Sequence, residues 1–160
     1  MRRPLALALI FVPFLSLVAP LAGAAGLGVG MKAALFPWSE FGLESAFVQL
    51  RMSDFLGVEG LTAILEGGLG LDLRTISLDT KLLLTRFPLD SGTLTPFTGG
   101  GLSLEFELVQ GALQLIPIPE GLAGVGYSLP PLLLLVELRV QSQVQGRGGM
   151  TILFGVVFEF

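Results

Sequence analysis

The sequence predicts an all-β fold: a closed, antiparallel, up-and-down transmembrane β-barrel, most simply of eight strands. Three observations support it. Apolar residues make up 52% of the chain, yet after residue 24 no apolar run approaches the ~20 residues that a spanning helix needs. Apolar side chains instead recur at every second position, which is the period of a β-strand. Charged side chains occupy the alternate positions, as expected when one strand face meets lipid and the other lines an interior.

The first 24 residues have the features of a secretory signal peptide. A basic start at Arg2 and Arg3 precedes an apolar stretch at 5–18, and Ala22-Gly23-Ala24 fits an A-x-A cleavage site. The apolar stretch is too short for a permanent membrane helix. The expected limits are a signal peptide at 1–24, cleavage specified by Ala22 and Ala24, and one barrel domain at 25–160.

Composition argues against several kinds of site. Loss of Arg2 and Arg3 leaves seven basic residues against thirteen acidic ones, with no basic stripe, so nucleic-acid binding is not expected. Cysteine and histidine are both absent, which removes disulfides and thiolate metal sites. We therefore expect no cofactor, no metal and no catalytic residues.

Residues 26–35 and 41–52 form the first predicted pair of strands. In 26–35, glycines and Lys32 share the face that would look into a narrow interior. Alternation is imperfect in 41–52. Phe47 belongs to an apolar set at odd positions and Val48 to one at even positions, so a regular strand would place the two sets on opposite faces. A β-bulge near these two residues would bring both sets to the lipid face. The bulge would place three polar residues inside: Glu44, Gln49 and Arg51.

The next three strands are predicted at 61–74, 76–87 and 96–108, each with leucines outward and charges inward. The sixth strand is less clear, because Pro117 and Pro119 cannot donate to a β-ladder. Two interpretations remain open at this point. Either a kinked strand spans 113–129, or an outer loop at 116–121 precedes a strand at 122–129. The last two strands are predicted at 132–144 and 150–160. Eight strands of about 11 residues fit within 25–160, and a membrane barrel needs an even number of at least eight.

The last strand resembles the closing strand of bacterial outer-membrane β-barrel proteins, which ends in an aromatic residue after alternating hydrophobic ones. With nearly all of 25–160 following the same pattern, the chain resembles the small eight-stranded barrels such as the OmpA-like transmembrane domain. The resemblance implies export through a Sec-type signal, contact with outer-membrane lipid, and periplasmic chaperones and the barrel-assembly machinery as partners during biogenesis. The implied assembly signal is Phe154, Val156, Phe158 and Phe160.

The charges of the predicted strands share the interior face. A cationic side chain facing mid-bilayer lipid costs ~2–4 kcal/mol, so lipid would enforce this segregation. Side chains fill an eight-stranded interior, and we expect these charges to form buried pairs that plug the barrel rather than an ion pathway. The expected interior network is Lys32, Glu44, Arg51, Glu66, Asp72, Arg74, Asp79, Lys81, Glu105, Glu107, Glu137, Arg139 and Glu159.

Three functions remain possible from the sequence. The His–Ser arrangement of barrel enzymes acting on lipids cannot be built without histidine, and the outer connections are mostly short for an adhesin. The sequence favours a non-catalytic barrel with a structural or narrow-pore role. The first alternative is a barrel that binds or passes a small hydrophobic molecule in a partly apolar interior. The second is a secreted soluble β-sandwich or lipocalin-like binding protein, because strand alternation by itself does not say which face meets water.

Overall fold

The computed structural model describes residues 26–35, 41–71, 75–85, 92–109, 112–144 and 147–160. The predicted signal peptide, its cleavage site and two predicted interior charges, Asp72 and Arg74, lie outside these ranges. Within them, no helix has both the length and the apolar character needed to cross a bilayer.

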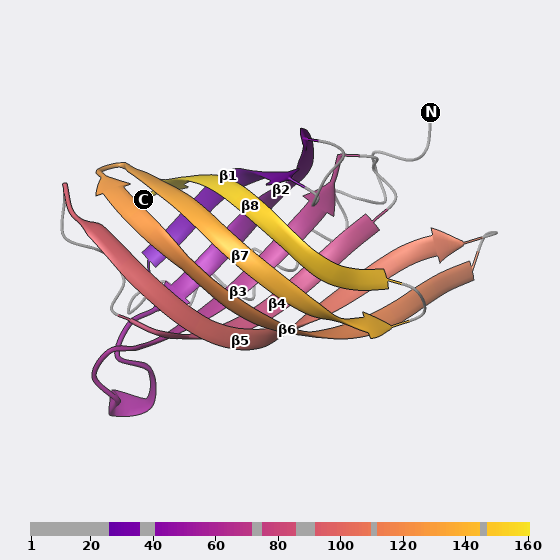
Figure 1. The fold of residues 1–160 in the computed structure, drawn as a ribbon, viewed down its shortest axis with the longest axis horizontal. Coiled ribbons are helices and arrows are strands. Elements are labelled where there is room, and N and C mark those ends of the chain that lie inside the picture. Colours follow the sequence, from indigo (N-terminus) through magenta and orange to yellow (C-terminus); the bar gives the residue numbers. More distant parts are fainter. Residues whose placement is uncertain (1–25, 36–40, 72–74, 86–91, 110–111, 145–146) are drawn as a thin grey trace.

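Eight strands form one closed barrel, which confirms the predicted fold class (Figure 1). Each strand pairs antiparallel with the next along the chain, and the last strand pairs with the first, so the sheet has no open side. The β-sandwich alternative is therefore wrong.

The strands are β1 (Gly26–Leu35), β2 (Phe41–Met52), β3 (Leu61–Gly70), β4 (Thr75–Leu84), β5 (Leu94–Val109), β6 (Ala112–Leu129), β7 (Leu132–Val144) and β8 (Arg147–Glu159).

Strand β7 shows most clearly why these sequences form a barrel wall. Its side chains alternate between the two faces over 132–142: Leu133 is 1% exposed, whereas Leu134 is 39% exposed. The same inward row continues through Glu137 and Arg139, both buried. Successive side chains of a strand point to opposite faces, so a period of two in the sequence becomes an apolar outside and a charged inside.

The bulge in β2 lies nearer to the start of the strand than predicted. The pairing of β1 with β2 shifts between Lys32 and Ala33, which face Ser45 and Leu43, so Glu44 is the extra residue. Phe47 consequently points inward and is 2% exposed. The Lys32 ammonium lies 4.4 Å from the centre of the Phe47 ring, and this cation–π contact stabilises an aromatic ring inside the barrel.

Strand β6 is continuous through both prolines, so the interpretation with a loop at 116–121 is wrong. The Leu122 carbonyl accepts a hydrogen bond from the Thr98 hydroxyl of β5 at 3.2 Å. Alternate residues of a strand point their backbone groups to opposite neighbours, so Pro117 and Pro119 face away from β5. The described pairing of β6 with β7 ends at Glu120 and Gln141. The prolines therefore lie beyond the described pairing of β6 with β7, where a missing N–H costs no ladder bond.

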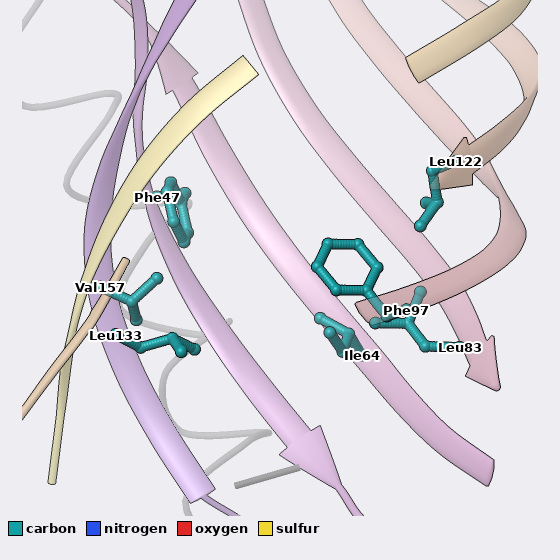
Figure 2. Packing of buried hydrophobic residues seen from close by; sticks show 7 residues of the cluster. All are labelled: Phe47, Ile64, Leu83, Phe97, Leu122, Leu133 and Val157. Carbon is teal, nitrogen blue, oxygen red and sulfur yellow. The ribbon is translucent and has the colours of Figure 1, made fainter. Parts of the chain in front are cut away.

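Seven buried apolar side chains pack inside the barrel, one from each strand from β2 to β8 (Figure 2). We call this cluster the apolar layer. In Figure 2 the side chains project from the strands toward the barrel interior. They are Phe47, Ile64, Leu83, Phe97, Leu122, Leu133 and Val157.

Candidate functional site: the charged barrel interior

A network of five buried charges crosses the interior next to the apolar layer, and we call it the ionic layer. Glu66 of β3 forms an ion pair with the Lys32 ammonium of β1, and its other oxygen lies 3.7 Å from the Lys81 ammonium of β4. The same ammonium lies 3.9 Å from a Glu137 oxygen of β7, which is 3.1 Å from the Arg139 Nε. The ionic layer therefore joins four strands, β1, β3, β4 and β7, across the interior. Its residues are Lys32, Glu66, Lys81, Glu137 and Arg139.

Two further acids extend the ionic layer. Glu120 of β6 is 6% exposed, and one of its oxygens lies 3.4 Å from the Arg139 Nε and 3.3 Å from the Gln141 Nε2. Asp79 accepts a hydrogen bond from the Ser103 hydroxyl at 2.6 Å. Glu120 was missed in the sequence analysis because the course of the sixth strand was open. The inward alternation of Ile116, Ile118 and Glu120 was the signal that could have found it.

A separate ion pair lies at the end of the barrel that holds the C-terminus. The Arg51 guanidinium of β2 contacts the Glu159 carboxylate of β8, and the Arg51 side chain is buried. Near this pair, the N–H of Phe160, the residue after β8, donates to the Leu27 carbonyl of β1 at 2.9 Å. The Phe158 and Phe160 rings meet edge to face with centroids 5.1 Å apart. The end of the barrel where β8 pairs with β1 therefore has an ion pair on the inside of the wall and a pair of aromatic rings on the outside.

Most of the predicted interior charges that are described lie in or beside these contacts. Glu44 and Glu105 line the opposite mouth of the barrel. Glu107 is half-buried, opposite Thr75 of β4. The structure therefore brings together a subset of the predicted network: Lys32, Arg51, Glu66, Asp79, Lys81, Glu137, Arg139 and Glu159.

The described interior holds two cavities on the two sides of the ionic layer. A vestibule of about 330 Å³ opens at the Glu44 mouth and ends at Lys32, Glu66 and Arg139. A second cavity of about 20 Å³ lies between the ionic and apolar layers, which is room for about one water molecule. In the described part of the chain, no cluster of three acidic residues has the geometry of a metal site.

The proposed assembly residues lie on the outer face of β8. Phe154, Val156 and Phe158 are opposite Ala33, Met31 and Val29 of β1. Val156 is 48% exposed. This outward row is continuous with the apolar outer faces of β1 and β7, so the residues form part of the wall that would meet lipid.

The sequence matches no protein-family model and no curated protein sequence. Among solved structures, the N-terminal β-barrel domain of Pseudomonas aeruginosa OprF matches with a TM-score of 0.61 and 13% identity, over 84% of this chain and 97% of that domain. The S-type phycobiliprotein lyase CPES of Guillardia theta has a TM-score of 0.44 and 10% identity, over 86% and 88%. The attachment invasion locus protein Ail of Yersinia pestis has a TM-score of 0.36 and 10% identity, over 85% and 96%. Of these three, the OprF match has a TM-score above 0.5, and it extends over nearly all of that domain. The chain therefore has the closed eight-stranded fold of the small outer-membrane β-barrels.

Proposed function

We propose that this chain is a non-catalytic, integral outer-membrane β-barrel with a structural role, and that its interior is closed. The observation that carries the proposal is the pair of layers across the interior. The ionic layer and the apolar layer fill the section between the vestibule and the Arg51–Glu159 pair. Side chains of an eight-stranded barrel are large enough to fill its section, and here salt bridges hold them.

The outer face supports a membrane location. Large apolar side chains cover it on successive strands, including Met31, Leu82, Leu138 and Val156, each at least 39% exposed. Soluble monomers rarely expose contiguous apolar patches beyond a few hundred Å². A secreted lipocalin-like binder would show the reverse arrangement, with an apolar interior and a polar exterior. Lipid is the solvent that matches this surface.

The hydrophobic-ligand alternative gains no support from the interior. Ligand sites occupy about 300–1,000 Å³ and are mostly apolar. The apolar layer here encloses a space of about 20 Å³, and the larger vestibule is lined by charges such as Glu44 and Glu105. The closed structural barrel is therefore the function that the geometry favours.

Electrical recording tests whether the barrel is closed. We expect purified protein in planar bilayers to give no steady single-channel conductance, because the apolar layer excludes a water column. Phe97→Ala removes the side chain that the layer receives from β5 and should produce brief openings. Leu134→Ala on the outer face is the control and should stay silent. Steady conductance of the unmodified protein would overturn the closed interior.

The C-terminal residue offers a test of assembly. We propose that the barrel-assembly machinery reads the outward row ending at Phe160, and deletion of this residue should reduce folded barrel in the membrane while leaving export intact. The deletion also removes the hydrogen bond from the Phe160 N–H to β1. Phe160→Trp keeps that bond and an aromatic ring, so it should assemble normally. The measurement is the heat-modifiable band in outer-membrane fractions; a normal yield of the deleted chain contradicts the proposed signal.

A further inference from the structure

The outer wall of the barrel has a hollow over strands β3 to β5. Its volume is about 490 Å³. The strands contribute the outward side chains of Leu65, Leu82 and Leu102 as walls, and Gly100 and Thr80 lie between them. A glycine and a threonine among leucines leave less side-chain volume on the wall, so the sequence itself creates the depression.

The β2–β3 turn covers one side of this hollow. Its short 3₁₀ segment η2 (Phe55–Gly57) is held by hydrogen bonds from the Gly57 N–H to the Asp54 carbonyl at 2.9 Å and from the Gly60 N–H to the Asp54 side chain at 2.9 Å. This fixed conformation places Phe55 at the border of the hollow. Figure 1 shows the turn at the same end of the barrel as the C-terminus. The hollow is therefore walled by the strands and bordered by an ordered aromatic ring.

The chemistry of the lining selects an uncharged, apolar occupant. The Thr80 hydroxyl already donates to the Leu102 carbonyl at 3.3 Å. Lys81 borders the hollow, but its ammonium lies inside the barrel against Glu66 and Glu137. No charged group of the described lining is left to bind a headgroup or an ion. Hydrocarbon matches such a surface, because its burial needs no hydrogen-bond partner.

We propose that this hollow binds one acyl chain of a membrane glycerolipid and retains it more tightly than the surrounding lipid. The inference rests on the proposed membrane location, because the hollow opens on the face that would meet lipid. A second copy of the barrel fits less well. The η2 turn stands beside the hollow with Leu56 82% exposed, and this projection keeps a broad barrel wall from reaching the floor. A flexible acyl chain is narrow enough to pass beside the η2 turn and reach the floor of the hollow.

Two matched threonines make the test specific. Thr80→Leu fills the hollow, and Thr98→Leu is the control. Thr98 also faces outward, and its hydroxyl also donates to a carbonyl of the next strand, at 3.2 Å, but it lies outside the lining. Native mass spectrometry would count 1-palmitoyl-2-oleoyl-phosphatidylethanolamine molecules retained by the full-length processed barrel after titration in detergent. Phe55→Ala, which removes the bordering ring, serves as a second variant.

The expected result is one retained lipid for the unmodified barrel and for Thr98→Leu, and a loss of about fivefold or more in lipid affinity for Thr80→Leu and Phe55→Ala. Equal retention by all four proteins overturns the acyl-chain site, as does a dimer that Thr80→Leu abolishes. Heat-modifiable migration is recorded for every sample. An unmodified chain that fails to fold as a barrel in detergent refutes the proposed function itself, whereas folded barrels with equal lipid counts refute only this inference.

Discussion

Replacing Glu66 by Gln is expected to lower the free energy of unfolding by about 3–5 kcal/mol, the usual effect of removing one partner from a buried ion pair. Glu66 is paired with two lysines, Lys32 and Lys81. Its neutral replacement leaves the Lys32 ammonium beside the Phe47 ring without its carboxylate partner, in a site where that lysine is 4% exposed. Lys81 keeps Glu137, so most of the loss should come from Lys32.

Urea titration of the barrel in lipid vesicles, followed by the heat-modifiable band, measures this loss. The same substitution at Glu59, which is exposed in the β2–β3 turn, is the control and should leave the midpoint unchanged. Adding Lys32→Met to Glu66→Gln should restore most of the stability, because it removes the uncompensated charge. A midpoint equal to that of the unmodified barrel for Glu66→Gln alone would show that the ionic layer contributes little.

The strands were predictable because, in the proposed membrane location, lipid acts on each strand separately. An outward position that meets lipid favours an apolar residue whatever its neighbours are, so the apolar alternation over 132–140 of β7 is readable without knowing the rest of the fold. β2 was harder, since the direction of Phe47 depends on where the bulge lies, and its inward position is stabilised by a lysine from another strand. A local pattern carries no information about that contact, and the predicted bulge was accordingly placed too late.

The pairing inside the barrel was not predictable for a related reason. Lys32 and Glu66 come from β1 and β3, which are not neighbours in the sheet, and Lys81 reaches Glu137 from β4 to β7. Such partners meet only after closure, across an interior whose geometry depends on the register of every strand. The sequence could predict which charges face inward, but the choice of partner belongs to the closed structure.

Introducing arginine at Val156 is expected to cost ~2–4 kcal/mol of folding free energy, the penalty for a cation on the lipid face near the bilayer middle. Val156 lies between Met31 of β1 and Leu134 of β7, in the middle of an apolar outer surface. No acidic side chain shares that face in the described strands, so the guanidinium would have neither water nor a partner. The yield of heat-modifiable barrel after refolding into vesicles measures the penalty.

The same arginine at Gln141 should be tolerated, and the comparison tests the assignment of the two faces. Gln141 points inward, and its amide nitrogen lies 3.3 Å from a Glu120 oxygen. The same oxygen forms an ion pair with Arg139. A guanidinium there meets a buried carboxylate instead of hydrocarbon. Equal tolerance of arginine at both sites would mean that lipid does not cover the leucine-rich face, and the membrane location would fail together with the acyl-chain site. A much lower folded yield for Val156→Arg than for Gln141→Arg would support an apolar solvent outside the barrel.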